Sequence, residues 1–192
     1  LVLQGSGSAD GRPGMFLRAD SNESIWDYVW GESNYVNNGL FRVAIVKETN
    51  DATNYRVYLN GEEDNTMVHP DGNQAVSENF INFDHPWTLL AYNDQGEPEA
   101  HVTGALDDVV IYSEALSAEQ VQQDYDRQGW EPGDSPAGKE AQDDLGVVDP
   151  VGEPRFWWPM DEGQGDLVED NAGDADGTNQ GASWVSGPYQ GG

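Results

Sequence analysis

Cysteine is absent from the 192 residues, which excludes a disulfide framework and a thiolate metal site. Lysine is almost absent and occurs twice, as Lys47 and Lys139. No apolar run approaches the ~20 residues that a membrane-spanning helix needs, and Leu1 does not open a signal peptide. We therefore expect no membrane insertion, and we expect the chain to be a processed or excised piece of a longer protein.

Positive charge is scarce throughout the chain. Thirty-six Asp and Glu residues stand against eight Lys and Arg residues, which gives a net charge of −28. This balance excludes a nucleic-acid binder by repulsion and disfavours anionic membranes as partners. An acidic, lysine-poor surface is typical of proteins from extreme halophiles, because molar salt screens the repulsion between carboxylates. The alternatives are an acidic secreted protein and one with many calcium sites.

Aromatic residues are plentiful, with seven Trp, eight Tyr and five Phe. High net charge and low hydropathy usually indicate disorder, but disordered segments are poor in aromatics. Here they lie in apolar strings such as residues 24–30 and 156–158. The chain therefore has a core with the acid on its surface, and its length fits one domain plus a linker.

Short β-forming runs separated by turn residues predict a β-sandwich. The candidate strands are residues 1–3, 15–18, 25–30, 40–47, 55–60, 88–92 and 106–112. The pair Asn60-Gly61 closes an alternating run and predicts a two-residue hairpin turn. One helix is predicted over residues 117–127, where Ser117 and Gln120 form a capping box and the acidic residues and glutamines face solvent.

The composition changes over residues 131–154, which are rich in Pro, Gly and acid, with seven acidic residues and one lysine. We interpret this stretch as a semi-extended linker that charge repulsion stiffens. Apolar sequence resumes at Arg155. The three parts are thus residues 1–130, the linker 131–154, and residues 155–192.

Four stretches resemble parts of one domain family, and they include the motifs that open and close its domain. Residues 104–119 read GALDDVVIYSEALSAE, which resembles the closing motif of laminin-G-like domains in the concanavalin A-like superfamily, and residues 54–61 resemble that family's strand and turn. The stretches WWPMDEG at 157–163 and DNAGDADGT at 170–178 resemble its opening. The resemblance implies an all-β concanavalin A-like jelly-roll sandwich of two antiparallel sheets with one short surface helix.

The order of these parts is unusual, because the opening of the family's domain follows its close. Residues 155–192 would then supply the opening strands of the sandwich whose main part is residues 1–130. Three explanations are open: one period of a tandem array, subunits that complete one another in a filament, or a circular permutant. We favour assembly, because without the opening strands residues 1–130 would leave sheet edges and apolar faces uncovered.

A structural calcium ion is implied by the same resemblance, and carboxylates with turn carbonyls at short spacing suit Ca²⁺. The candidate ligands are Asp170, Asn171, Asp174, Asp176 and Asp108. The alternative is that any loop of so acidic a chain resembles a cation site. Glycans would stack on aromatics, of which Trp26, Trp30, Tyr35, Trp87 and Tyr92 are candidates, although most large aromatics belong to a core.

Signs of catalysis are missing. The superfamily's glycoside hydrolases carry an E-x-D-x-x-E type of string, which is absent here, and Asp107 and Asp108 are expected on opposite faces of a strand. His69, His85 and His101 are scattered. We predict a non-catalytic, structural or adhesive module, extracellular or at the cell surface, of a halophile's surface fibre or repeat-containing surface protein. It would assemble head to tail with copies of itself by strand complementation. The alternative is a calcium-dependent module of a secreted protein that binds carbohydrate, such as cell-surface glycans.

Overall fold

The computed structural model describes residues 2–4, 12–18, 26–34, 41–48, 55–68, 89, 92–94, 97–99, 106–127 and 151–184. The chain divides into two compact units. The first comprises Leu1–Asn37 and Arg42–Gly104, and the second comprises Asn38–Phe41 and Ala105–Gly192. Most of the predicted linker, residues 131–150, lies outside the described residues, and so do both ends of the chain.

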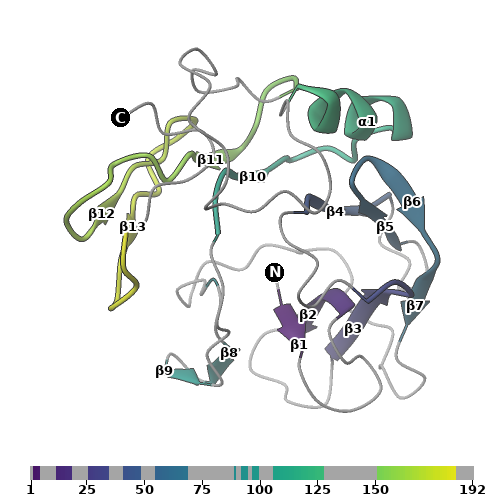
Figure 1. The fold of residues 1–192 in the computed structure, drawn as a ribbon, viewed down its shortest axis with the longest axis horizontal. Helices are drawn as coiled ribbons and strands as arrows, with labels where there is room; N and C mark the ends of the chain where they lie inside the picture. Colours follow the sequence, from purple (N-terminus) through teal and green to yellow (C-terminus); the bar gives the residue numbers. More distant parts are fainter. Residues whose placement is uncertain are drawn as a thin grey trace. The chain divides into compact units, whose positions relative to one another are not determined.

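Within its described residues, the first unit contains two antiparallel sheets and a hairpin (Figure 1). The larger sheet has the order β1 (Val2–Gln4), β2 (Arg12–Arg18), β3 (Trp26–Gly31) and β7 (Thr66–Val68). The smaller sheet has the order β4 (Val43–Lys47), β5 (Tyr55–Leu59) and β6 (Glu62–Asp64), and the hairpin pairs β8 (Tyr92–Asp94) with β9 (Glu97–Glu99). Strand β3 lies against β5, and β2 against β4, so the two sheets are in contact.

The core of this unit is formed by apolar side chains of β3, β4 and β5. The buried residues are Val29, Trp30, Val46, Tyr55, Val57, Tyr58 and Leu59. Branched and aromatic side chains favour strands because they pack well on a pleated surface. Strand β5 therefore supplies most of this core.

The turn between β5 and β6 confirms the predicted hairpin. Asn60 and Gly61 have φ angles of 53° and 82°, the left-handed conformation that a two-residue turn of this kind needs at both positions. The turn is also tied to the residue before β4. The Asn60 N–H donates to the Arg42 carbonyl at 2.9 Å, and the Arg42 N–H donates to Asn60 Oδ1 at 2.9 Å.

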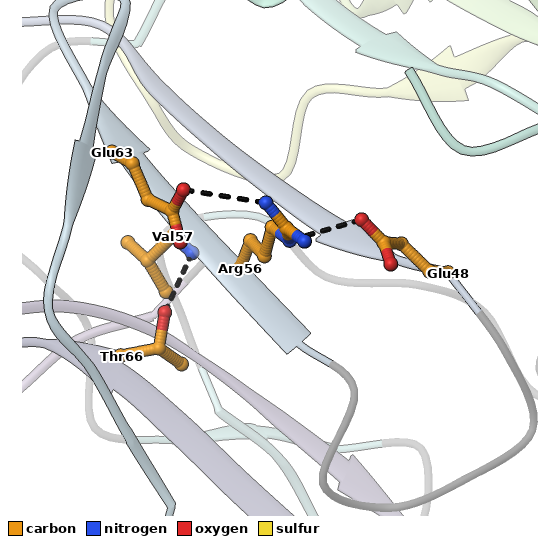
Figure 2. Close-up of polar contacts among 5 residues, drawn as sticks. All are labelled: Glu48, Arg56, Val57, Glu63 and Thr66. Carbon is orange, nitrogen blue, oxygen red and sulfur yellow. Dashed lines mark hydrogen bonds and ion pairs between the residues drawn. The ribbon is translucent and has the colours of Figure 1, made fainter. Parts of the chain in front are cut away.

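Strands β6 and β7 link the two sheets at a corner, because β6 pairs with β5 and β7 pairs with β3. Asn65 lies between them. Thr66 Oγ1 accepts a hydrogen bond from the Val57 N–H at 2.9 Å (Figure 2). The Asp64 carboxylate accepts two more, from the backbone N–H and the hydroxyl of Ser33, both at 2.9 Å. These contacts fix the point at which the chain passes between sheets.

Gly31 at the end of β3 leaves room for this corner, which gives a testable prediction. A Cβ at position 31 would meet the Asp64 carboxylate and would come within 3.3 Å of Val57 Cγ1. We expect Gly31→Ala to lower the free energy of unfolding by about 1–3 kcal/mol, the usual cost of overpacking, as measured by denaturant titration. Gly177→Ala is the control, because its Cβ would meet Val168 at an ordinary 3.4 Å. Equal effects of the two variants would contradict the assignment.

The described part of the second unit contains one helix and two short antiparallel pairs (Figure 1). Its elements are β10 (Val109–Ile111), α1 (Ala118–Asp126), β11 (Phe156–Trp158), β12 (Leu167–Val168) and β13 (Gly177–Thr178). The predicted helix and its capping box are confirmed, since Ser117 and Gln120 exchange side-chain and backbone hydrogen bonds. One helix acid does not face solvent as expected. Asp124 is buried because it follows buried Val121 by three residues and so lies on the same helix face.

Two predicted strands differ in extent from the observed ones. The strand expected at 106–112 begins only at Val109, because Asp108 has a φ of 50° that interrupts extended backbone. The strand expected at 88–92 is observed at Tyr92–Asp94, with most of residues 88–91 outside the described part.

The fold class is as predicted: antiparallel strands dominate, with one short helix in the described residues. Among those residues there is also no helix with the length and apolar character that crossing a bilayer would require.

Candidate docking site at strands β10 and β11

Strands β10 and β11 bring together segments that are more than forty positions apart in the sequence. Val109, Val110 and Ile111 face Trp158, Trp157 and Phe156 in antiparallel register. The Arg155 N–H extends the pairing by donating to the Ile111 carbonyl at 2.7 Å. β-branched residues opposite aromatic ones form favourable cross-strand pairs. Phe156 and Trp157 are buried, so this short ladder closes part of a core.

A side-chain hydrogen bond locks one end of the ladder. The Trp157 indole N–H donates to Asp108 Oδ1 at 2.8 Å. Asp108 has a left-handed backbone, with a φ of 50°, and its N–H donates to Asp107 Oδ1 at 3.1 Å. A residue with a Cβ pays roughly 1–2 kcal/mol for this conformation. The bond to Trp157 helps to offset that cost, so the two residues support each other.

Met160, with a φ of 60°, also has a left-handed backbone. Because Val109 faces Trp158, Met160 follows β11 at the same end of the ladder at which Asp108 precedes β10. Strained residues persist where surrounding contacts hold them, and they gather at functional sites. This end of the β10–β11 pair is therefore the candidate site.

Asp170 organises the loop that follows β11. Its Oδ1 accepts the N–H of Trp157 at 2.9 Å and of Ala172 at 3.1 Å, and its Oδ2 accepts the N–H of Ala175 at 3.1 Å. Its own N–H donates to Asp176 Oδ1 at 3.0 Å. The Asp170 side chain is buried, with 8% of its surface exposed, and both of its carboxylate oxygens accept hydrogen bonds. A buried carboxylate that accepts several backbone hydrogen bonds acts as a fixed cross-link for the loop.

These contacts also set the protonation of Asp170. Burial raises the pKa of this carboxyl group, and the backbone N–H donors of Trp157, Ala172, Ala175 and Gly173 lower it. The donors outweigh burial, so the pKa lies below the usual aspartate range. Asp170 is therefore ionised at neutral pH, the state in which it accepts all of these bonds.

Residues 155–184, which we call the clip, carry many further bonds among themselves. The Trp158 indole N–H donates to the Ala175 carbonyl at 2.9 Å, and the Trp184 indole N–H donates to the Gly165 carbonyl at 2.7 Å. The Asn171 N–H donates to the Trp157 carbonyl at 2.8 Å. Strands β12 and β13 pair within the clip. The clip is thus held together by its own residues, whereas its ladder and the Trp157 indole bond join it to residues 108–111.

The five residues proposed as calcium ligands do not form a coordination shell in this arrangement. Asp108, Asp170 and Asp176 each accept hydrogen bonds from protein N–H groups, while Asn171 and Asp174 are exposed. In the described part of the chain, no three acidic or histidine side chains gather so as to hold a metal ion. Calcium binding at these residues therefore stays a prediction, and no role below depends on it.

Calcium removal provides a direct measurement. We expect excess chelator in molar sodium chloride to leave the melting temperature unchanged, because Asp170 is satisfied by backbone donors rather than by a cation. The readout is thermal unfolding followed by circular dichroism, with added calcium as the matched control. A rise that saturates at low calcium concentration and is reversed by chelator would show ligand binding to the folded state and restore the calcium hypothesis.

The structure describes three of the five aromatic residues proposed to stack on glycans. Trp30 is buried in the core of the first unit. Trp26 and Tyr92 lie on β3 and β8. The remaining candidates, and the three histidines, lie outside the described residues: Tyr35, Trp87, His69, His85 and His101. Sequence reasoning singled out Asp108 and the motif that contains Trp157 separately, but it missed the hydrogen bond between them.

A comparison with protein-family models agrees with the fold. A laminin-G-type family model described as the concanavalin A-like lectin/glucanases superfamily matches residues 4–122. Comparison with curated proteins gives no match. A crystallised part of an S-layer domain-containing protein from Clostridium thermocellum is similar in structure, with 12% sequence identity, a TM-score of 0.35, and coverage of 64% of this chain and 67% of that one. The family match spans more than half of the residues, so the chain belongs to the concanavalin A-like lectin/glucanases superfamily.

Proposed function

We propose that this chain is a non-catalytic structural or adhesive module of a halophile's cell surface, joined head to tail with copies of itself by strand complementation. The observation that carries the proposal is the β10–β11 ladder. It pairs the segment that resembles the family's closing motif with the segment that resembles its opening. Residues 128–150 connect the two, and their Pro-, Gly- and acid-rich sequence suits a linker that lets the clip reach a neighbour.

The non-catalytic part of the proposal rests on sequence. Glycosidases generally need two carboxyl groups at a defined separation. One acts as the general acid, and the other acts as the nucleophile or the general base. The string that supplies such a pair is missing from the chain. Asp108 binds an indole, and Asp170 binds backbone N–H groups. These two carboxylates thus have structural partners, which supports a binding or building role.

Light scattering tests the proposal. We would measure the mass of the chain in solution across a dilution series at about 3 M salt, well above the concentration at which the screening length falls to about 3 Å. Polymers that lengthen with concentration support head-to-tail assembly. A monomer at every concentration would reject it and favour the glycan-binding module, which a glycan array then tests with sialylated, neutral and anionic sugars.

Salt dependence tests the halophilic part of the proposal. At about 0.1 M salt the screening length is about 10 Å, so repulsion among the surplus carboxylates acts across much of a domain. We expect the melting temperature to rise by several degrees between about 0.1 and 3 M sodium chloride, since each kcal/mol shifts it by about 2–4 °C at this size. A melting temperature that does not change with salt would remove the halophile assignment.

The few basic residues should respond in the opposite sense. Arg56 forms ion pairs with Glu48 at 2.9 Å and with Glu63 at 3.4 Å (Figure 2). The carboxylate of Glu48 is the main cause of a raised Arg56 pKa, with hydrogen bonding to Tyr58 and the charge of Glu63 next. The pairs are exposed, so salt screens them and they contribute little. Arg56→Gln is therefore the control, and its effect on melting should shrink as salt rises.

A further inference from the structure

We propose that the exchanged element is the whole clip, already folded, and that the bond between Trp157 of one copy and Asp108 of a second copy is its recognition contact. This inference rests on the proposed function, which states that copies assemble but not which atoms they use. The occupant of the β10 edge is thus residues 155–184 of another copy of this chain.

Many hydrogen bonds of the clip join its own residues to one another. Asp170 binds Trp157, Ala172 and Ala175, all of which belong to the clip. The indoles of Trp158 and Trp184 also bond to carbonyls of the clip. These bonds move with the clip when it leaves β10. The donor is therefore a loop that keeps its own cross-links rather than a bare strand, which reduces the ordering cost of docking.

The contacts between the clip and β10 form one short, continuous interface. They include three facing residue pairs, the Arg155 bond to Ile111 and the Trp157 bond to Asp108. In these contacts between described residues, the receiving side is residues 108–111. Identical contacts form whether the clip comes from the same chain or from another copy. The choice between them depends on the connection and on concentration, as in other domain exchanges.

The sequence that connects the clip to the rest of the chain is long enough for exchange between copies. Residues 128–150 can span roughly 3.3–3.6 Å per residue when extended, enough to leave the parent molecule. Their acidic residues repel one another and favour extension. Two chains of net charge −28 also repel each other, and salt screens that repulsion. Exchange between copies should therefore increase with salt, whereas closure within one chain gains less.

Cysteine cross-linking distinguishes the two arrangements cleanly, because the chain has no native cysteine. Ser113 and Arg155 are exposed and flank the ladder at its Ile111–Phe156 end. A Ser113→Cys variant and an Arg155→Cys variant would be unfolded together, refolded in molar salt and treated with a short bis-maleimide. We expect a heterodimer whose linked peptides contain positions 113 and 155, with a yield that rises with salt.

Two controls make the experiment decisive. Gln123→Cys, on the exposed face of α1, replaces Ser113→Cys to measure random collision. With Trp157→Phe added to the Ser113→Cys variant and Asp108→Ala added to the Arg155→Cys variant, the indole bond can form only between the two copies. The heterodimer should then increase about tenfold relative to the pair without these changes, in line with one hydrogen bond to a charged group. Circular dichroism of each variant confirms that it folds. A doubly substituted chain with cysteines at 113 and 155 measures closure within one molecule.

The outcomes separate this inference from the proposed function. Cross-links between 113 and 155 that form only within the doubly substituted chain, with mixed variants no better than the Gln123→Cys control, would overturn clip exchange. If light scattering then still shows polymers, the proposed function stands and another surface joins the copies. If Trp157→Phe on one copy and Asp108→Ala on the other leave the heterodimer yield unchanged, the ladder is exchanged but the Trp157–Asp108 bond is not its recognition contact.

Discussion

Replacing Asp170 with alanine is expected to lower the free energy of unfolding by about 3 kcal/mol. The buried carboxylate accepts N–H groups from Trp157, Ala172 and Ala175, and hydrogen bonds to charged groups contribute about 1.5–3 kcal/mol each, with losses that are not additive. Alanine leaves these donors without their acceptor in a poorly hydrated place. Denaturant titration at about 3 M salt, a concentration where screening is nearly complete, would measure the change.

Asp174 is the matched control, because it lies in the same loop but is exposed. Asp174→Ala removes the same charge and should change the unfolding free energy by no more than about 0.5 kcal/mol, as for other surface substitutions. If both variants lost stability equally and both losses were reversed by calcium, the loop would be a metal site rather than a hydrogen-bonded cross-link.

The pH dependence of the Asp170 contribution follows from its pKa. The pKa of Asp170 lies below its usual range in the folded chain: burial raises it, but the backbone N–H donors lower it by more. The unfolded chain therefore binds the proton first as pH falls. The stability from Asp170 is complete above the pKa of the unfolded group and is lost as pH falls through the folded pKa. Native chain and Asp170→Ala should consequently converge in stability only in acid.

Trp157→Ala is expected to be the most damaging substitution in the second unit, at about 3–5 kcal/mol. The side chain is 8% exposed, so its removal leaves a large cavity. It also takes away the donor to Asp108 Oδ1. Trp184→Ala is the control, because Trp184 is less buried than Trp157 although its indole N–H also donates to a carbonyl. A loss at Trp184 as large as that at Trp157 would show that the ladder has no special importance.

A double-mutant cycle separates the indole bond from packing. Trp157→Phe keeps most of the ring volume and removes the N–H, and Asp108→Ala removes the acceptor. We expect a coupling of about 1–2 kcal/mol between the two, because residues that share a hydrogen bond are not additive. Additive losses would mean that the 2.8 Å contact contributes no stability of its own.

Local rules predicted those elements whose signals are local. Ser117 and Gln120 predicted where the helix begins, and Asn60-Gly61 predicted the hairpin turn. Both predictions succeeded because capping and turn geometry depend on a few adjacent residues. The all-β class followed from short runs of β-forming residues. These features need no knowledge of distant partners.

Features that depend on distant partners were harder to predict. Asp108 was expected within a strand, but it has a positive φ and bonds to Trp157, forty-nine positions away. Asp170 was predicted to bind calcium, and that stays a prediction. What the sequence did not indicate is that its carboxylate accepts the backbone N–H groups of Trp157, Ala172 and Ala175. A carboxylate in a Gly- and Asp-rich loop suits both kinds of partner. The sequence does not distinguish them, because the choice depends on where the backbone N–H groups point.

The antiparallel register of β10 and β11 has a mechanical consequence. Ile111 and Phe156 lie at the end of the ladder from which the chain continues toward residues 128–150. Tension across those residues within one molecule therefore pulls both strands from the same end and peels the rungs apart one after another. In an exchanged pair, tension that enters one copy at Asp108 and the other at Arg155 acts on opposite ends. All three rungs then share the load, so the same short ladder resists stretching between molecules better than it resists opening within one.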